Sequence, residues 1–550
     1  MLQKPLTTFP KLNNRRLRLF LLFLIMAVSF IKTTHMQLTT PLNQIKLQSE
    51  ALQYHKENNF NPKKSLLNIL HFLHNCGDSE YGVYFHWDDW MPLPTNKLDH
   101  ARLNNGVCDD QLIQFSSVSA HWLESLAAKK LRGMCHMFCQ FPIPEKLILT
   151  TDSKFIEIPV VEKKRLNIQN NKNDDIITTR DLIASMTTLN LHKSQFPYRD
   201  IPKLPHKLEI DPEDFKFNPR EEITKLEYKL GNGTIDRQEY KHLKSLQYSN
   251  SIVDTTDRYF KYAWIFTDVY QGNSHHVAYP FFQRYISDRE RQAVLHHMVR
   301  VWFQLMEAYG FQTWINYGSM LGWKFNGLNM PWDTDIDVQI PIAQLDKLAQ
   351  VLNKTLVVEN PRYGNARYWL EVSPTFVRQG NGKNHIDARF IDINSGLYID
   401  ISALSFEEQQ QEEEEPLLRC KNYNYFSYDE ISPIQSSFFE GASVYLPNNI
   451  TGILNRKYPG ALTDYTFKDF EFTNDMWVSQ TNQDPNYLQD EYLIAKDSIA
   501  RHKYLEQFGY DKVEEMEELP IYRKDPWDYY EDLINHGLDN DRWYIRKEIV

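Results

Sequence analysis

The residues best suited to chemistry are three closely spaced aspartates. Asp333, Asp335 and Asp337 alternate with other residues, and Ile336 and Val338 flank the last of them. On a β-strand, alternate side chains point to one face, so the carboxylates share a face while the aliphatic side chains are buried on the other. Like charges at this spacing repel unless a cation offsets them, and carboxylates bind hard divalent cations such as Mn²⁺ or Mg²⁺. The pattern therefore favours a metal site for phosphoryl transfer over the alternative, a solvated edge strand.

A glycine and a serine precede these aspartates along the chain. A turn at Gly318 and Ser319 is poor in side chains, which lets backbone amides approach a phosphate group closely. A Gly-Ser turn followed by an Asp-x-Asp strand is the order found in nucleotidyltransferases of the DNA polymerase β type. We therefore expect an α+β (α/β) fold in which a nucleotidyltransferase-like mixed sheet is flanked by helices.

A third acidic position is expected on a neighbouring strand. The segment from Ile386 to Leu404 has the pattern of a hairpin, with a turn at Asn394–Gly396. Asp400 stands on the face opposite the aliphatic residues of its strand, so it is the candidate third metal carboxylate. Asp387 and Asp392 are weaker candidates, which are better explained as turn or salt-bridge residues. The predicted catalytic residues are therefore Asp335, Asp337 and Asp400.

Helical periodicity is strong before this region. Leu295, Met298 and Trp302 recur at helical spacing within the segment from Asp288 to Tyr309, and Gly310 supplies a C-terminal stop. By contrast, residues 407–415 are all Glu or Gln, a composition that gains nothing from burial. We expect a helix over 288–309 and a solvated loop over 407–415.

The N-terminus predicts the compartment. Basic residues precede an apolar run from Leu19 to Ile31, in the order typical of a secretory signal or signal anchor. The run is shorter than the ~20 residues that span an average bilayer, although thinner early-secretory membranes ease this mismatch. Cleavage near Ala27-Val28-Ser29 is the alternative. We expect an uncleaved anchor with the rest of the chain in the lumen, a single-pass type II arrangement.

The bulk composition is that of a globular protein. The 550 residues are 42% hydrophobic and 24% charged, enough for two or three domains. The formal net charge of -11 opposes a nucleic-acid partner, because phosphate backbones are bound mainly by concentrated Lys and Arg. The five cysteines allow at most two disulfides and one free thiol. Cys135 and Cys139 are better explained by a disulfide or burial than by a metal half-site.

These patterns divide the chain into seven segments. They are a cytosolic tail (1–18), the signal-anchor helix (19–31), a stem (32–60), a membrane-proximal region of unknown role (61–165), a linker with a polar helix near 220–244 (166–250), the domain with the acidic residues (251–480) and a C-terminal extension (481–550).

The segment from Gly318 to Val338 resembles the LicD/fukutin family of phosphotransferases. The family pattern is a Gly-Thr/Ser-Leu-Leu-Gly start followed by Pro-Trp-Asp and alternating acids, and the spacing here matches without gaps. The segments Trp323–Gly327 and Asp387–Asp392 are similar to the fungal branch that acts in mannosyl phosphorylation of Golgi mannan. Two positions depart from bacterial relatives: Thr334 replaces an Asp, and Phe325 replaces an Arg that contacts phosphate.

The resemblance implies roles for individual residues. Metal would be bound by Asp333, Asp335, Asp337 and Asp400, and phosphate would be faced by Gly318, Ser319 and Lys324. It also implies GDP-mannose as the donor and mannan glycoproteins as acceptors, in the Golgi membrane. A mannan hydroxyl would attack the phosphorus next to mannose, GMP would leave, and Asp400 or Asp335 would accept the proton.

Three functions remain open at this point. The first is a metal-dependent transferase of mannose phosphate, favoured by the intact acids. The second is a non-catalytic partner of a separate Golgi mannosylphosphate transferase, favoured by the missing basic residue at Phe325. The third is a lectin-like module, which would explain the aromatic content but leaves the acidic residues without a purpose.

Overall fold

The computed structural model covers most of the chain between residues 62 and 517. Residues 1–61 and 518–550 lie outside the described part, and so do 77–80, 92–107, 109, 118–123, 165–178, 190–195, 253–258, 267–273, 284–285, 287, 364–365, 378–384, 407–415, 422 and 481–492. The chain divides into two compact units. The first comprises 1–58 and 94–118, and its described helix is α5 (Asp110–Ser117). The second comprises 59–93 and 119–550, and it holds every element below.

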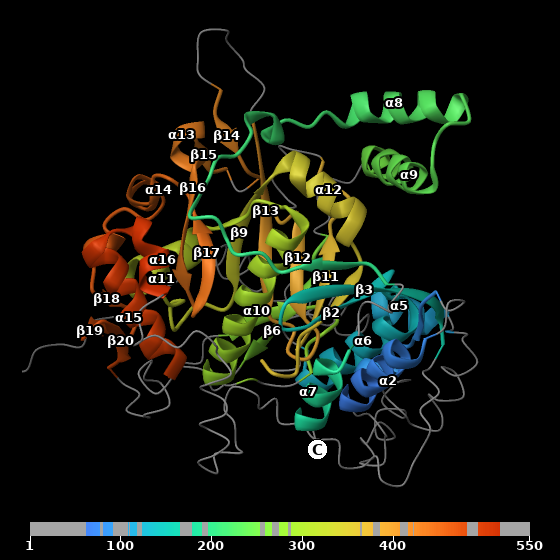
Figure 1. Ribbon diagram of the computed structural model, residues 1–550, viewed down its shortest axis with the longest axis horizontal. Coiled ribbons are helices and arrows are strands. Elements are labelled where there is room, and N and C mark those ends of the chain that lie inside the picture. Colours follow the sequence, from blue (N-terminus) through green and yellow to red (C-terminus); the bar gives the residue numbers. More distant parts are fainter. Residues whose placement is uncertain are drawn as a thin grey trace, which may run out of the picture. The chain divides into compact units, whose positions relative to one another are not determined.

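A mixed sheet of twelve strands forms the centre of the second unit (Figure 1). Its strands are β1 (Val83–Phe85), β2 (Lys146–Thr150), β3 (Lys154–Lys163), β4 (Tyr198–Asp200), β8 (Trp314–Ile315), β9 (Ile336–Pro341), β10 (Thr355–Val358), β11 (Arg367–Val372), β12 (Ala388–Asp392), β13 (Tyr398–Phe406), β14 (Leu418–Arg419) and β15 (Tyr425–Phe426). The main path runs β1-β3-β2-β10-β11-β12-β13-β14-β15, and β9 pairs with β13 and β8. The predicted architecture of a mixed sheet with helices is thus confirmed.

Each face of the sheet packs against its own set of helices. One core contains Val357, Leu370 and Phe390 of the sheet together with residues of α10 (Asp288–Tyr309) and α12 (Ile342–Leu352). The other contains Leu356 and Trp369 together with residues of α2 (Pro62–Asn75), α3 (Trp87–Trp90), α6 (Leu126–Cys139) and α7 (Thr179–Thr187). Alternate strand residues enter opposite cores, as the period of a strand requires.

Smaller elements surround the sheet. Three small sheets are β5 (Lys207–Leu208) with β16 (Ile434–Phe439) and β17 (Ala442–Leu446), β6 (Tyr262–Phe266) with β7 (Ser274–Ala278), and β18 (Thr466–Phe467) with β19 (Phe470–Thr473) and β20 (Met476–Ser479). The further helices are α11 (Tyr317–Asn326), α13 (Tyr428–Ile431), α14 (Ile450–Lys457), α15 (Leu493–Phe508) and α16 (Val513–Glu517). Short 3-10 helices lie at Pro212–Phe215, Ala461–Thr463 and Tyr510–Lys512.

Two local predictions are confirmed. Helix α10 spans Asp288–Tyr309, and Gly310 follows it in the left-handed region with φ 73°. Strands β12 and β13 pair antiparallel as the expected hairpin. The 3.6-residue and two-residue periods of these segments are strong enough to specify the element without tertiary information.

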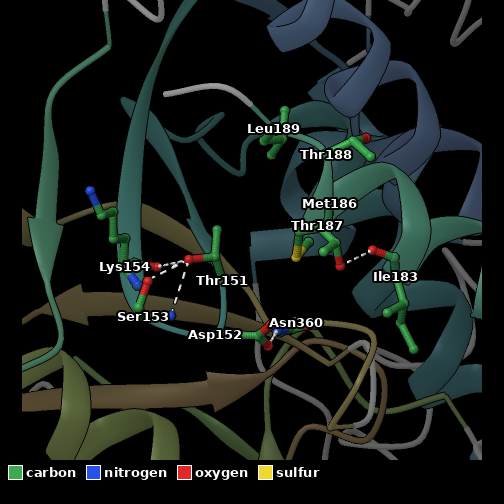
Figure 2. A pocket seen from close by; sticks show the side chains of 10 residues that line it. All are labelled: Thr151, Asp152, Ser153, Lys154, Ile183, Met186, Thr187, Thr188, Leu189 and Asn360. Carbon is green, nitrogen blue, oxygen red and sulfur yellow. Dashed lines mark hydrogen bonds between the residues drawn. The ribbon is translucent and has the colours of Figure 1, made fainter. Parts of the chain in front are cut away.

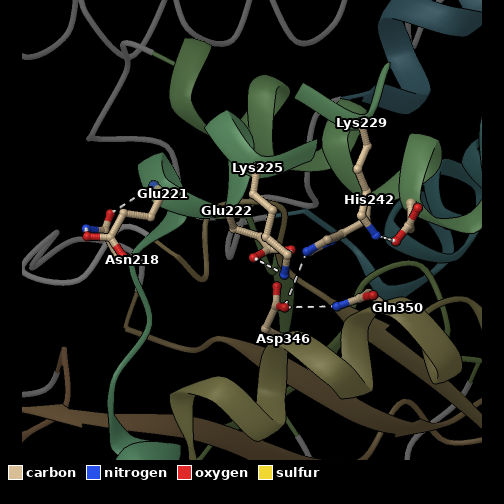
Figure 3. Close-up of polar contacts among 9 residues, drawn as sticks. Asn218, Glu221, Glu222, Lys225, Lys229, His242, Asp346 and Gln350 are labelled. Atoms are coloured by element: carbon tan, nitrogen blue, oxygen red, sulfur yellow. Dashed lines mark hydrogen bonds and ion pairs between the residues drawn. The ribbon is translucent and has the colours of Figure 1, made fainter. Parts of the chain in front are cut away.

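The polar helix predicted near 220–244 is instead two helices. Helix α8 (Pro219–Gly231) ends before Gly233, which has φ 67°, and the capping box of Asp236 and Glu239 starts α9 (Arg237–Ser251). The two helices lie side by side in Figure 1. Figure 3 shows how α9 meets α12, where His242 Nε2 lies 3.3 Å from Asp346 Oδ2.

The structure differs from the predicted separate region over 61–165. Strand β2 pairs in parallel with β10 and antiparallel with β3, so residues 146–163 extend the central sheet. Leu147, Ile148 and Leu149 are buried. A strand that is apolar on both faces needs neighbours and covering helices, but the sequence does not identify these partners.

The predicted anchor at 19–31 and loop at 407–415 lie outside the described residues. Within the described ranges, no helix combines the length and apolar character needed to cross a bilayer. Cys108 and Cys139 are disulfide-bonded, whereas Cys76, Cys135 and Cys420 are not in disulfides. Cys135 is buried, so the expectation of a disulfide or burial for the Cys135 and Cys139 pair is confirmed.

Candidate active site

The register of the central sheet places four charged side chains in one row. Asp337 of β9 lies opposite Asp400 of β13 in a parallel pairing. Arg389 of β12 lies opposite Asp400, and Glu371 of β11 lies opposite Arg389. Residues in register on neighbouring strands share a face of the sheet. We call Glu371, Arg389, Asp400 and Asp337 the charged row.

Asp400 is bound to a cation supplied by the chain itself. Arg389 donates from Nε to Asp400 Oδ1 at 2.5 Å and from its terminal nitrogen to Oδ2 at 3.3 Å. The guanidinium lies 3.8 Å from the ring centroid of Tyr398. Burial is the largest influence and lowers the pKa of Arg389, but Asp400, Tyr398 and Asp335 together outweigh it, so the pKa is raised overall. The predicted third metal carboxylate is therefore already one half of a buried ion pair.

No cation is hydrogen-bonded to Asp335 or Asp337 among the groups that shift their pKa values. Burial raises the pKa of Asp335 well above its usual range, and the charges of Asp337, Asp333 and Asp400 raise it further. Burial also raises the pKa of Asp337 strongly, followed by the charges of Asp400 and Asp333. Both side chains are half-buried by exposed area. Acids in mutual repulsion are a frequent mark of a site that takes positive charge.

Asp333 lies at the edge of this group, in the loop before β9. Its Oδ1 accepts the N–H of Thr334 at 3.0 Å. Burial raises the pKa of Asp333, while the charges of Arg291 and Lys468 oppose the shift. The structure therefore places the four predicted metal residues, Asp333, Asp335, Asp337 and Asp400, near enough for their charges to interact.

Gly318 and Ser319 lie in the first turn of α11 and not in a free turn. A Cβ at position 318 would lie 2.5 Å from Asp333 Oδ2, so glycine allows that carboxylate to approach the helix. Ser319 is fully buried, and its Oγ accepts the backbone N–H of Asp337 at 3.0 Å. The contacts of these two residues therefore position the acids.

The residue before this pair is strained. Tyr317 has φ 47°, a left-handed conformation that is uncommon for a residue with a Cβ. Its backbone N–H is bound by Asn316 Oδ1 at 2.8 Å, and its hydroxyl accepts from Gln339 and Asn424. Such conformations persist where the surroundings hold them, often beside functional sites.

The basic residues near the acids do not include Lys324, the predicted one. Lys324 pairs with Glu506 of α15 at 3.3 Å. Instead, Lys457 lowers the pKa of Asp337, and Lys468 lowers that of Asp333, against the larger effect of burial in both cases. Lys457 and Lys468 are far from the acids in sequence, so no spacing signal could have identified them. Arg389 could have been found only from the hairpin register.

A metal ion would have to draw these side chains together. Among the described residues, no three His, Cys, Asp or Glu side chains form a ready group of metal ligands. The available donors are nevertheless carboxylate oxygens, which Mn²⁺ and Mg²⁺ prefer. The raised pKa values of Asp335 and Asp337 add an electrostatic reason for a cation to bind there.

A separate cavity is lined by both polar and apolar residues (Figure 2). It has a volume of about 420 Å³ and lies between the β2–β3 turn, α7 and Asn360. Asn360 donates to Asp152 Oδ1 at 2.7 Å across one side of it. None of the predicted site residues lines this cavity.

Comparison with known proteins identifies the acidic region. Residues 310–449 match the family described as "LicD/FKTN/FKRP, nucleotidyltransferase domain". Over this span the chain is similar to the LicD family. All four acids, Asp333, Asp335, Asp337 and Asp400, lie inside the matched span.

Two proteins of Saccharomyces cerevisiae are similar over about the same length. Mannosyltransferase regulator 14 is 33% identical over 276 residues, which is 47% of this chain and 29% of the relative. Mannosyltransferase regulator 4 is 33% identical over 290 residues, 47% of this chain and 25% of the relative. The matched part spans less than a third of either relative. The predicted resemblance to the LicD family and its fungal mannosylphosphate-related branch is confirmed.

Proposed function

We propose that this chain transfers mannose phosphate from GDP-mannose to the N- or O-linked mannan of cell-wall glycoproteins. The proposed place is the Golgi membrane, with residues 19–31 as the anchor. The main support is the register that sets Asp337 opposite Asp400, beside Asp335 and within the span that is similar to the LicD family. Phosphoryl transfer depends mostly on positioning and charge neutralisation, which a cluster of acids provides through a cation.

The cofactor in this proposal is a divalent ion, Mn²⁺ or Mg²⁺. Asp333, Asp335 and Asp337 would hold it, because their oxygens are not engaged by a buried arginine as those of Asp400 are. When bound, such an ion neutralises diphosphate oxygens and favours the ionised form of an attacking hydroxyl.

The chain's own side chains have separate tasks in the transfer. The mannan oxygen forms a bond to the phosphorus next to mannose, and the bond from that phosphorus to the GMP oxygen breaks. The proton of the mannan hydroxyl needs an acceptor. Protonation of Asp400 would disrupt its two hydrogen bonds from Arg389, so we assign the acceptor role to Asp335. The exposed Lys457 and Lys468 lie where they can offset phosphate charge.

Ser319 and Gly318 act at one remove from the substrate. The Ser319 hydroxyl holds the backbone at Asp337, and the missing side chain at Gly318 leaves room for Asp333. The hydrogen bond of Ser319 restricts Asp337 before a substrate arrives, which is how a site lowers the cost of reaching reactive geometry.

A second candidate function is a non-catalytic activator of a separate mannosylphosphate transferase. Three observations favour it. Both relatives are named regulators, and Arg389 neutralises the third acid from within the chain. Phe325 also packs against Trp477 with ring centroids 4.9 Å apart, so no phosphate-binding arginine stands at that position.

The test is a transfer assay with the purified full-length chain. GDP-mannose, Mn²⁺ and a mannan oligosaccharide are supplied, and GMP release and mannan phosphate are measured. Asp335→Ala and Asp337→Ala are compared with Asp200→Asn, whose side chain is 76% exposed on β4. Transfer by wild type and Asp200→Asn but by neither site variant would support the enzyme.

A second experiment, in cells that lack the protein, distinguishes a regulator from an enzyme. If purified wild type is silent, and both site variants still restore mannan phosphate in the cells, the catalytic proposal is wrong. In that case the fold acts through a partner, and the acids are dispensable for it.

A further inference from the structure

A small aromatic sheet borders the acidic residues. Strands β18, β19 and β20 form it, and we call residues 465–479 the aromatic hairpin unit. Two of its rings are open to solvent: Tyr465 is 54% exposed and Phe467 is 49% exposed. Exposed aromatic rings are available for stacking, whereas buried ones serve the core.

This unit is joined to the acidic site through Trp332, the residue before Asp333. The Trp332 ring lies 5.0 Å from Phe467, 5.2 Å from Phe470 and 4.9 Å from Trp477, between ring centroids. Phe470 and Trp477 are buried beneath it. Phe467 and the half-buried Trp332 therefore form an aromatic surface that continues into the first acid of the site.

A lysine adjoins the exposed ring. Lys468 follows Phe467, is exposed, and has its Nζ 5.6 Å from the Phe467 ring centroid. The Phe467 ring in turn contacts Trp332, which directly precedes Asp333. The ammonium therefore lies beside the aromatic surface that leads to the first acid of the site.

The turn that presents Lys468 is held in place. Lys468 has φ 54°, a conformation that costs energy for a residue with a Cβ. The next residue, Asp469, is buried and accepts from Ser479 Oγ at 2.6 Å, while its carbonyl accepts from Gln480 N–H at 2.7 Å. The ammonium is therefore carried on a braced turn and not on a loose loop.

The three groups match the parts of one ligand class. A flat aromatic ring stacks on a nucleobase, an ammonium binds a phosphate, and adjacent carboxylates serve a phosphate-bound cation. A neutral mannan chain would use the ring but not the ammonium. We propose that Phe467 and Lys468 form the nucleoside-diphosphate subsite of the acidic site, with the base on the Phe467 and Trp332 surface and a phosphate at Lys468 Nζ. This deepens the proposed function, because it rests on a nucleotide donor.

The test measures binding apart from transfer. Isothermal titration of the full-length chain uses GDP, inorganic pyrophosphate and a mannan oligosaccharide, each with Mg²⁺. Phe467→Ala is expected to weaken GDP by about tenfold and to leave pyrophosphate unchanged, because only the base loses its stacking partner. Lys468→Gln is expected to weaken both GDP and pyrophosphate by about tenfold, because both present phosphate.

Matched variants control for the loss of an exposed ring or charge elsewhere. Phe508→Ala removes a ring that is 53% exposed on α15, and Lys225→Gln removes a lysine that is 63% exposed on α8. Both should bind GDP as wild type does. Circular dichroism of each variant confirms that the fold is retained.

The outcomes separate this subsite from the transfer reaction. GDP affinity that is unchanged in both Phe467→Ala and Lys468→Gln overturns the subsite even if wild type transfers mannose phosphate. A loss of mannan binding in Phe467→Ala with normal GDP binding also overturns it, since the surface would then hold the acceptor. If wild type shows no transfer activity but both variants lose GDP affinity as expected, the subsite is supported and only the proposed transfer reaction is excluded.

Discussion

Two buried acidic regions of the same unit have opposite ionisation behaviour. Glu359 is fully buried, yet its pKa is lowered, because His297, Arg300 and the N–H of Ala366 outweigh the effect of burial. Asp335 and Asp337 are only half-buried by exposed area, yet their pKa values are raised well above the usual range. Burial is the largest influence in both regions and raises the pKa in each, so the sign of the neighbouring charges decides the direction of the net shift.

The contacts around Glu359 explain its structural role. Its Oε1 lies 3.3 Å from both His297 Nδ1 and the Arg300 terminal nitrogen, and its Oε2 accepts from Ala366 at 3.2 Å. These partners come from α10 and the loop before β11, so the cluster joins a helix to the sheet. In the charged row, Arg389 satisfies Asp400, and Asp337 lies on the other side without such a partner.

The largest expected effect is on transfer activity, which should differ between variants of the two regions. Asp337→Asn should reduce transfer of mannose phosphate by about 100-fold or more, because a charge that acts in the transition state is removed. Glu359→Gln should leave the activity per folded molecule close to that of wild type. GMP release, normalised to the folded fraction, measures both. Equal losses in the two variants would contradict the distinction between the regions.

The second prediction concerns stability, and here the variant in the Glu359 region should show the larger effect. Arg300→Met removes the cation beside a buried carboxylate, so the free energy of unfolding should fall by about 3–5 kcal/mol. Asp337→Asn should leave it unchanged or raise it, because a mutual repulsion is relieved. Denaturant unfolding in the presence of EDTA gives both values. A destabilised Asp337→Asn variant would show that this acid has a structural role.

The third prediction is a pH dependence of opposite sign in the two regions. Burial lowers the pKa of His297 to about 4, so the unfolded chain binds more protons between about pH 6.5 and pH 4. His297 therefore costs stability as the pH falls through this window, up to about 3 kcal/mol at 1.36 kcal/mol per unit. Comparing wild type with His297→Gln across the window isolates this contribution. A difference that does not change with pH would contradict it.

Asp335 and Asp337 should behave in the opposite way without metal. Their folded pKa values are raised, so the folded chain binds more protons once the pH exceeds the unfolded value of about 4. Stability attributable to these groups falls as the pH rises through their raised pKa values. The Asp335→Asn/Asp337→Asn double variant should remove this fall, and added Mn²⁺ should reduce it in wild type.

The smallest expected effect tests how closely the acids are positioned. Gly318→Ala places a methyl group against Asp333 Oδ2, so we expect a loss of about 1 kcal/mol in stability and a several-fold loss of transfer. Gly231→Ala is the matched control, because a Cβ there meets nothing within 4 Å. Thermal unfolding and GMP release are measured for both. Identical behaviour of the two variants would mean that Asp333 moves aside freely.

Local periodicity made several elements predictable. The apolar spacing between Asp288 and Tyr309 predicts α10 with the bounds that it has, since a helix is specified by contacts within a few residues. The alternation at Asp335–Val338 predicts a strand, and β9 begins at Ile336, so Asp337 lies on it whereas Asp335 lies just before it. The turn near Asn394–Gly396 predicts the β12–β13 hairpin. The candidate acids could be chosen from the chain alone for the same reason.

Pairings between distant segments could not be predicted in this way. The parallel pairing of β9 with β13 sets Asp337 opposite Asp400, and the hairpin register sets Arg389 opposite Asp400. The turn residues alone do not specify the pairing of β12 with β13 to within one residue. Shifting that pairing by one residue would move Arg389 to the other face of the sheet. Lys468 reaches Asp333 only through the fold of β18 and β19.

The primary structure therefore identifies which residues can do chemistry, because residue type and short-range spacing are local properties. Tertiary structure decides what charge each of them carries, because ionisation depends on neighbours brought together from distant segments. Asp400 illustrates the division: its alternation with aliphatic residues marks it as a site acid, but only strand register shows that Arg389 holds it. Asp337, opposite Asp400 in that register, and Asp335, just before β9, are not held by an arginine in this way, which is why they are the acids that we assign to the ligand.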